Sequence, residues 1–435
     1  IALRSSEWMQ QDIFTNYQTE TELMRYIFRL AEKDFSLVDG MMPLGSCTMK
    51  LNSAAELNPV SWPNLSSIHP FSPSNQTKGY SKIISDLEKW ISDIVGLKSV
   101  SFQPNAGSQG EFAGLLAINS YFESKGELLR KKCLIPKSAH GTNPASAVMA
   151  GFDVLTVECD EEGNIDLQDL SIKVKKFNTQ IGALMLTYPS THGVFELQIR
   201  KICDLIHSVG GFVYLDGANL NAQVGLCKPG KYGVDVCHLN LHKTFCIPHG
   251  GGGPGVGPVA ASETLSQFLP THSLRDNYLS NSSNYVSSAK YGSASILPIS
   301  WMYIKMAGFR GLRKATMHAI LSANYIAHSL QHKFKILYKG KNNFVAHECI
   351  LDFRDLKSKT GLSVNDLAKR LIDYSFHAPT ISWPVPETIM IEPTESESLV
   401  ELDRFCEAML LIGEEISEIE KNVALKNNNV ISNSP

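Results

Sequence analysis

Two ionisable residues stand just after apolar segments that have the length of buried strands. Asp216 follows the apolar run 212–215, and Lys243 follows the run 234–239 after a short connection. Each residue alone has an ordinary interpretation, because Asp often caps a turn and Lys usually lies on the surface. Ligands of open α/β sheets bind at the carboxyl ends of the strands, so the two side chains together can face one crevice.

An acid and a lysine at one crevice form the pair that pyridoxal phosphate requires. The lysine forms a Schiff base with the cofactor, and the acid keeps the pyridine nitrogen protonated, which makes the cofactor an electron sink. The sequence therefore predicts a pyridoxal-phosphate site in which Lys243 is the Schiff-base lysine and Asp216 is the partner of the ring nitrogen.

Two further segments can serve such a cofactor. The small-residue turn 105–110 precedes a predicted helix at 111–122, and a helix N-terminus binds anions such as a phosphate, although Ser108 as a plain helix cap explains the turn equally well. His140 follows the apolar run 133–135; its ring can stack on the cofactor, or it is an ordinary solvent-facing histidine.

Two other segments have hydroxyl groups or unusual glycine content. The segment 188–193 contains Ser190, Thr191 and His192, which can bind a phenolic oxygen or a carboxylate, or simply form a turn. Four consecutive glycines at 250–253 cost backbone entropy, which predicts a moving lid or hinge beside Lys243 or an unusual tight turn.

The elements that must position these residues alternate along the chain. Apolar runs with strand length recur at 133–135, 154–157, 181–187, 212–215 and 234–239, and helical patterns separate several of them, as at 167–177 and 198–209. Unbroken apolar strands that alternate with helices predict an α/β fold with a mostly parallel sheet covered on both faces.

Three parts are predicted along the chain. Residues 1–76 form an N-terminal arm and loop segment, and residues 77–330 form the large cofactor domain, which ends in a long helix from 297 to about 331. Residues 331–435 form a smaller α/β domain with strands at 346–353 and 388–391 and helices at 364–373 and 398–419.

Composition narrows the class of protein. The 435 residues are 43% hydrophobic with a net charge of −3, which gives no bulk attraction to nucleic acid or to an anionic membrane. No run is apolar and long enough to span a bilayer. The nine cysteines form no CxxC pair, so we expect neither a disulfide scaffold nor a metal site.

Several strings resemble one family, the P-protein of the glycine cleavage system. They are PLGSCTMKLN at 43–52, SAHGTNPAS at 138–146, YPSTHGV at 188–194, YLDGANLNAQVG at 214–225, HLNLHKTFCIPHGGGGPG at 238–255 and EPTESES at 392–398. The resemblance runs from about residue 34 to 419 and implies fold type I of the pyridoxal-phosphate enzymes. The form of the first string resembles that of the second half of the fused P-proteins, the half that keeps the active lysine.

The resemblance also implies roles for individual residues. Lys243, Asp216 and His140 would be catalytic, as Schiff-base lysine, ring-nitrogen partner and stacking ring. The remaining cofactor contacts would come from Ala106, Gly107, Ser108, Thr187, Ala218 and His242, with Gly292 and Ser293 reaching a phosphate across a subunit interface. Ser190, Thr191 and His192 are the expected substrate contacts.

The implied activity is decarboxylation of glycine with transfer of the aminomethyl group to the lipoyl arm of H-protein. Implied partners are glycine, lipoylated H-protein, the other P-protein half, a second copy of the whole, and, indirectly, the T- and L-proteins. The chain begins with Ile, so we expect a fragment or a processed product, and residues 1–11 lack the apolar core of a secretory signal peptide. The resemblance implies that the tail at 427–435 is cut, because the family continues beyond it. The expected compartment is the bacterial cytoplasm, or the mitochondrial matrix in a eukaryote.

Two rival functions remain at this point. An aminotransferase or a cysteine desulfurase has the same fold, and a desulfurase needs a mobile cysteine. Cys246 near Lys243 is a candidate for it, although the role we expect for Cys246 is that of a small buried residue. The second rival is a regulatory half without catalysis, which the presence of both Lys243 and Asp216 disfavours.

Overall fold

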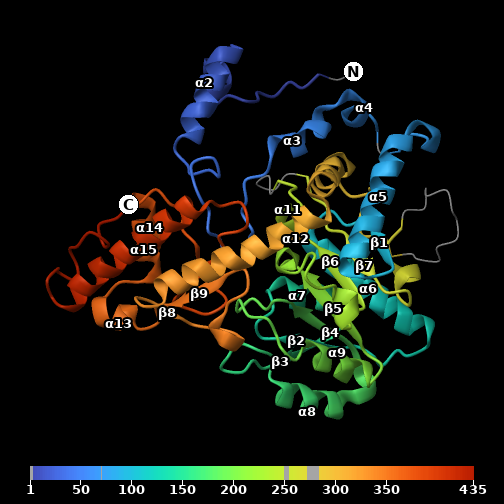
Figure 1. Cartoon of the computed structure of the whole chain (residues 1–435). Coiled ribbons are helices and arrows are strands. Elements are labelled where there is room, and N and C mark those ends of the chain that lie inside the picture. The colour runs from blue at the N-terminus through green and yellow to red at the C-terminus, as the bar shows by residue number, and fades with distance from the viewer. Residues whose placement is uncertain (1–2, 70, 249–253, 272–283) are drawn as a thin grey trace.

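The computed structural model describes residues 3–69, 71–248, 254–271 and 284–435. Two sheets organise the chain (Figure 1). The larger has the strand order β1-β7-β6-β5-β4-β2-β3 and is parallel except for β7, which pairs antiparallel with both β1 and β6. Its strands are β1 Ser99–Ser101, β2 Lys132–Pro136, β3 Asp153–Val157, β4 Ile181–Thr187, β5 Phe212–Gly217, β6 Val236–Leu239 and β7 Val259–Ala261.

Helices cover both faces of this sheet, as the alternating pattern predicts. One face packs against α5 Lys78–Val95, α8 Leu167–Phe177, α9 Ile199–His207 and the start of α12 Leu297–Leu330. The other face packs against α6 Gly107–Ser124 and α7 Thr142–Met149. The predicted mostly parallel α/β sheet is confirmed. The strands β1 and β7, at three residues each, are too short for an apolar period to reveal them.

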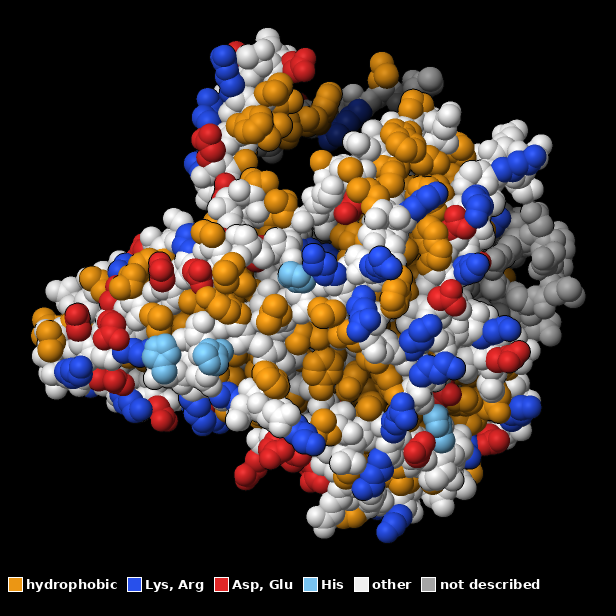
Figure 2. All heavy atoms as spheres, viewed as in Figure 1, with side chains coloured by type: hydrophobic (Ala, Val, Ile, Leu, Met, Phe, Trp, Pro, Cys, Tyr) orange, Lys and Arg blue, Asp and Glu red, His pale blue; other side chains and the backbone are white. Residues whose placement is uncertain are grey.

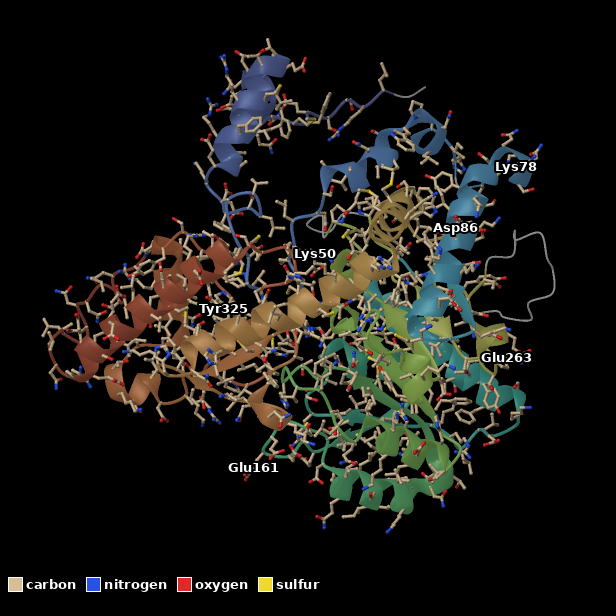
Figure 3. The ribbon with its side chains drawn as sticks, viewed as in Figure 1. Lys50, Lys78, Asp86, Glu161, Glu263 and Tyr325 are labelled. Atoms are coloured by element: carbon tan, nitrogen blue, oxygen red, sulfur yellow. The ribbon has the colours of Figure 1, made fainter. Side chains whose placement is uncertain are left out.

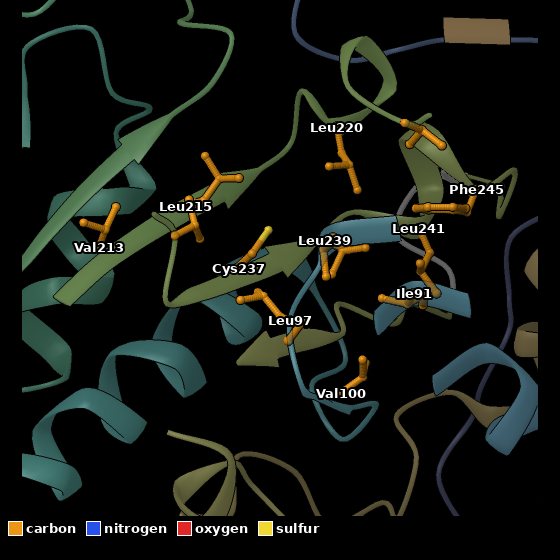
Figure 4. Close-up of a cluster of buried hydrophobic side chains, with 14 of the residues drawn as sticks. Ile91, Leu97, Val100, Val213, Leu215, Leu220, Cys237, Leu239, Leu241 and Phe245 are labelled. Carbon is orange, nitrogen blue, oxygen red and sulfur yellow. The ribbon is translucent and has the colours of Figure 1, made fainter. Parts of the chain in front are cut away.

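The two-residue period of a strand decides which side chains face which helices. On β5, Val213 and Leu215 point into the core beside α5 and α9, as Figure 4 shows for the cluster that also contains Leu239. Tyr214 therefore points to the opposite face, toward α6 and α7. Asp216 has the same parity as Tyr214, so its carboxylate lies on the α6 and α7 side.

The second sheet is antiparallel and small, in the order β10-β11-β9-β8. Its strands are β8 Lys335–Ile336, β9 Cys349–Asp352, β10 Thr380–Ile381 and β11 Thr388–Ile391, and its helices are α13 Leu356–Thr360, α14 Val364–Asp373 and α15 Leu399–Glu420. The end of α12 and Met41 from the N-terminal segment share its apolar core. The boundaries predicted at 76/77 and 330/331 stay predictions.

The helix α12 links the two sheets, and it is broken where the sequence predicts a continuous helix. Gly308 has φ +57° and ψ −176°, which lie outside the helical region. A glycine adopts these angles without a steric penalty, because it has no Cβ. The backbone therefore leaves the helical path at Gly308 and resumes it. Leu312, beyond this break, still packs in the core of the large sheet, whereas Ala323, Ile326 and Leu330 pack in the core of the small one.

The N-terminal segment reaches both bodies. It contains α1 Ile13–Asn16, α2 Glu20–Ala31, α3 Ala54–Leu57 and α4 Pro63–Ser66; two short helices, α10 Pro229–Tyr232 and α11 Leu241–Thr244, lie in the large body. α2 projects away from the rest of the chain and carries exposed apolar side chains (Figure 2), and the segment then returns to pair Leu44 with Ile391 of β11. Within the described ranges, no helix is long and apolar enough to cross a membrane.

Candidate active site

A pocket of about 450 Å³ lies at the carboxyl ends of β4, β5 and β6. Three parts of the chain form its wall: the N-terminal segment, the large body and the small body. The lining residues are Gly45, Ser46, Cys47, Gly107, Ser108, Glu111, His140, Thr142, Thr187, Thr191, Asp216, Ala218, Asn219, Asn240, His242, Lys243, Thr380 and Trp383. The pocket therefore brings together eight of the eleven predicted cofactor residues, which are Gly107, Ser108, His140, Thr187, Asp216, Ala218, His242 and Lys243.

Asp216 is the buried acid of the pocket, with 3% of its surface exposed. Its carboxylate accepts hydrogen bonds from Asn143 Nδ2 and from the Ala218 backbone N–H, both at 2.9 Å, and His238 Nε2 lies 3.4 Å from Oδ1. Burial raises the pKa of Asp216, but His238, these two hydrogen bonds and Lys243 outweigh burial, so the net pKa lies below the ordinary value. Asp216 is thus ionised at neutral pH.

His238 and Tyr214 support Asp216 from behind, and the sequence prediction missed both. His238 lies two positions after Val236 on β6, so both face the same side of the sheet, which is also the side of Asp216 on the neighbouring β5. Its Nδ1 lies 2.6 Å from the Tyr214 hydroxyl. A histidine within an apolar strand is the signal that could have identified this partner, because a buried polar ring requires hydrogen bonds.

Glu111 is a second buried acid in the pocket wall that the sequence prediction missed. It lies on α6, and its carboxylate accepts hydrogen bonds from the Thr142 and Ser146 hydroxyls, both at 2.8 Å. These bonds tie α6 to the start of α7, where Asn143 contacts Asp216. Glu111 therefore fixes the helix that orients the Asp216 carboxylate.

Lys243 lies half-buried on α11, one short turn beyond the end of β6. Its Nζ donates a hydrogen bond to the backbone carbonyl of Ser46, so the N-terminal segment closes the pocket over the lysine. Lys243 also acts on Asp216 through space, because its charge lowers the pKa of that carboxyl group. The predicted acid and lysine thus share one pocket.

The start of α6 gives the pocket a site for an anion. Ala106 is extended, and the helix begins at Gly107 with Ser108 next, so the first N–H groups of an 18-residue helix border the pocket. A Cβ at position 107 would lie 2.4 Å from Asn240 Oδ1, which is why a glycine is required there. Ala106 itself is outside the set of lining residues.

His140 stands at the pocket mouth. Its Nδ1 accepts a hydrogen bond from the Thr142 backbone N–H at 3.2 Å and lies 2.9 Å from the Thr142 hydroxyl. The ring meets Trp383 of the small body edge-on, with 5.6 Å between the ring centroids. His140 is exposed to solvent and also lines the pocket, so each of the two interpretations of this residue describes part of its environment.

Several predicted residues lie elsewhere. Thr191 lines the pocket, but Ser190 does not, and His192 stacks on Tyr338 with the ring centroids 4.4 Å apart. Gly292 and Ser293 line a separate cavity of about 550 Å³, beside His69 and Lys290. The proposed lid at 250–253 lies outside the described residues.

Cys246, the candidate nucleophile of a desulfurase, is buried and does not line the pocket. Burial raises the pKa of its thiol to about 12, despite the opposing charge of Lys50. A thiol with this pKa is protonated at neutral pH and inert, which is the small core role of a buried cysteine.

The pocket has the donors and acceptors that pyridoxal phosphate requires. Thr187 Oγ1 and Asn240 Oδ1 are buried in its wall without a hydrogen-bond partner among the described residues, so both can receive a polar ligand. An ionised acid, an amine and a helix N-terminus surround the same space. These residues fit the ring nitrogen, the aldehyde carbon and the phosphate of that cofactor.

The fold is that of the fold type I pyridoxal-phosphate enzymes. A crystal structure of glycine decarboxylase (P-protein) of the glycine cleavage system superposes with a TM-score of 0.74 at 17% identity, over 91% of this chain and 90% of that chain. An L-threonine transaldolase from Pseudomonas fluorescens superposes with a TM-score of 0.66 at 15% identity, over 95% of this chain and 90% of that chain.

Sequence comparison adds the family. The glycine cleavage system P-protein model matches residues 4–274, and the model of the glycine dehydrogenase C-terminal domain matches residues 315–435. The chain therefore belongs to the glycine cleavage system P-protein family.

Two relatives are named glycine dehydrogenase (decarboxylating). The protein of Prochlorococcus marinus (strain NATL1A) is 62% identical over all of this chain, and that of Synechococcus sp. (strain RCC307) is 60% identical over all of it. This chain spans 45% and 46% of the length of these two relatives.

Proposed function

We propose that this chain carries the pyridoxal-phosphate site of a glycine decarboxylase and acts with the other half of a P-protein. Glycine loses its carboxyl group as CO2, and its aminomethyl carbon forms a bond to one sulfur of the lipoyl disulfide of H-protein, while the second sulfur is reduced to a thiol. The observation that carries the proposal is the shared pocket of Lys243 and Asp216, in a chain of this family.

In this proposal Lys243 binds the cofactor covalently, and the ionised Asp216 holds a proton on the ring nitrogen. When bound, the cofactor supplies the electron sink for the electron pair that CO2 leaves behind. Asn143, Ala218 and His238 keep Asp216 ionised and oriented.

Other residues of the pocket position the cofactor and the substrate in the proposal. Ala106, Gly107 and Ser108 bind the phosphate at the start of α6, and His140 covers the ring. Thr187, Ala218 and His242 complete the ring contacts. The substrate contacts remain Ser190, Thr191 and His192, of which Thr191 lines the pocket.

The remaining partners are also part of the proposal. Gly292 and Ser293 contact a phosphate of a second subunit. H-protein delivers its lipoyl arm through the mouth of the pocket between His140 and Trp383. The T- and L-proteins act on the product afterwards. This mouth is a suitable entrance because it lies where the large body contacts the small body, and because His140 is exposed there. The proposed compartment is the bacterial cytoplasm, since both relatives named above are cyanobacterial.

Exchange of labelled bicarbonate into the carboxyl group of glycine tests the proposal. We expect exchange that requires lipoylated H-protein and the complementary P-protein half, and that disappears in Lys243→Ala. A complete system that fixes no label would contradict the proposed substrate, and exchange that persists in Lys243→Ala would contradict the assigned lysine. A visible absorbance band of bound cofactor, lost in the same variant, provides an independent measurement.

A further inference from the structure

Two buried glutamates face each other beside the pocket, and the proposed function assigns neither a role. Glu348 immediately precedes β9 and Glu392 immediately follows β11, and the antiparallel register places Cys349 opposite Ile391. The next cross-strand pair is therefore Glu348 opposite Glu392, on one face of the sheet. Both side chains are fully buried, and each has a carboxylate oxygen within 4.8 Å of the other and of a ring nitrogen of His347.

The hydrogen bonds of the two carboxyl groups are unequal. Glu392 accepts three: from the Thr48 hydroxyl at 2.6 Å, from the Thr48 backbone N–H at 3.0 Å and from Asn221 Nδ2 at 3.2 Å. Glu348 Oε2 accepts two, both from Ser46: one from the backbone N–H at 2.8 Å and a longer one from the hydroxyl at 3.5 Å. Its Oε1 is buried without a partner among the described residues. Only a protonated carboxyl group has an O–H to donate, so the unpartnered oxygen is the place for a proton.

We propose that Glu348 and Glu392 share one proton, carried by Glu348 at Oε1, and that this pair is a positioning element that holds residues 46–48 against Lys243. Two ionised carboxylates at this separation in a fully buried site would repel each other strongly, and one shared proton removes that repulsion. The link to catalysis rests on the proposed function of Lys243, whereas the location of the proton does not.

The geometry of the segment explains why it needs such support. Ser46 and Thr48 both have positive φ, +64° and +51°, a region that non-glycine residues occupy only when their surroundings hold them there. The backbone N–H of each is bound by one carboxyl group of the pair. In this conformation the Ser46 carbonyl accepts the hydrogen bond from Lys243 Nζ, and Cys47 lines the pocket.

The charges around the pair agree with a single negative charge. Burial raises the pKa of both glutamates, and the ammonium group of Lys243 opposes it. His347 contributes no charge near neutral pH, because burial and Lys243 lower its pKa to about 3. Glu395 is paired with Lys50 at 2.6 Å, so its charge is compensated separately. One negative charge on the pair therefore faces one positive charge on Lys243.

Infrared difference spectroscopy locates the proton directly. Spectra of the full chain without cofactor, recorded at pH 7 in H2O and in D2O, should contain the deuterium-sensitive carbonyl band of a buried protonated carboxyl group. Burial also raises the pKa of Glu397 to about 7, so the band is read as the difference between the wild-type chain and each variant. We expect Glu348→Gln to remove a component of the band that Glu397→Gln leaves in place. Absence of the band from the wild-type chain, or a wild-type-minus-Glu348→Gln difference without such a component, would overturn the proposal.

Labelling of Cys47 by a maleimide, quantified by peptide mass spectrometry, reports whether the segment stays in place. Glu348→Gln keeps an acceptor for Ser46 and a donor toward Glu392, so we expect a rate within about twofold of wild type. Glu348→Ala removes the hydrogen bonds of Glu348, and Glu392→Gln places an amide donor against the donors of Thr48. Both variants should raise the labelling rate at least about tenfold.

The labelling rates also distinguish the proton assignment from a purely structural role. If Glu348 were ionised, Glu348→Gln would remove a charge beside Cys47 and raise the labelling rate as much as Glu392→Gln does; that result would refute the assignment. Thr48→Val removes one hydrogen bond of Glu392 and serves as a milder variant should Glu392→Gln not fold, with an expected rise of about threefold. Both measurements need neither cofactor nor H-protein, so they remain decisive if the glycine exchange assay fails.

Discussion

Replacement of Asp216 by Asn separates the chemistry of the site from its stability. Asn keeps the shape of the side chain but cannot carry the charge that holds a proton on the ring nitrogen. The Ala218 N–H can still donate to the amide oxygen of Asn. The new NH2 group would face Asn143 Nδ2, yet Asn143 Oδ1 is buried without a partner among the described residues, so a flip of the Asn143 amide restores a hydrogen bond.

The cost to folding follows from these contacts. Two charge-assisted hydrogen bonds become neutral ones, a loss of about 1 kcal/mol each, and the attraction to His238 is also lost. Relief of the burial of a charge offsets part of this loss, because burial opposes the ionised form of Asp216. We expect a net destabilisation of about 2 kcal/mol or less, which corresponds to a fall in Tm of about 4 °C or less for a chain of this length.

The cost to activity should be much larger, about 100- to 1,000-fold in glycine–bicarbonate exchange, because the variant loses an electrostatic interaction that stabilises developing charge. Asp235→Asn is the matched control. Asp235 also accepts from a histidine and from a backbone N–H, His207 Nε2 and Val213 N at 2.8 Å each, but it precedes β6 at the opposite edge of the sheet. Equal exchange in the two variants, or unfolding of Asp216→Asn at the assay temperature, would refute the reasoning.

Three further perturbations have defined outcomes. Gly107→Ala places a Cβ 2.4 Å from a buried side-chain oxygen and should weaken pyridoxal-phosphate binding at least about tenfold by absorbance titration, whereas Gly141→Ala, with open space around its Cβ, should not. The lowered pKa of His347, about 3, means that the folded state binds fewer protons than the unfolded state below about pH 6.5; stability should fall as the pH drops from there toward 3, by up to about 1.4 kcal/mol per pH unit, and urea titrations of His347→Gln should show a flatter profile. Lys50, labelled in Figure 3, pairs with Glu395; Lys50→Met leaves Glu395 unpaired and should cost about 3–5 kcal/mol, most of which Lys50→Met with Glu395→Leu should recover in thermal unfolding.

Much of the large body could be predicted from the sequence, because its strands are apolar throughout and its helices carry long apolar stripes. The runs 181–187 and 212–215 and the stripe on α5 correspond to β4, β5 and α5 within a few residues. Short or irregular elements were missed because they contain no long apolar run or stripe. β7 has three residues, and α7 begins inside a segment rich in small and polar residues that resembles a turn.

The sequence by itself determined the acid and the lysine, because the ends of two neighbouring parallel strands meet at one edge of a sheet. Only the tertiary structure decided what surrounds them. His238 supports Asp216 through pairing of β5 with β6, and Ser46, Thr380 and Trp383 reach the pocket from segments far from it along the chain. Such contacts depend on the packing of three separate parts of the chain, and no local period or spacing in the sequence specifies that packing.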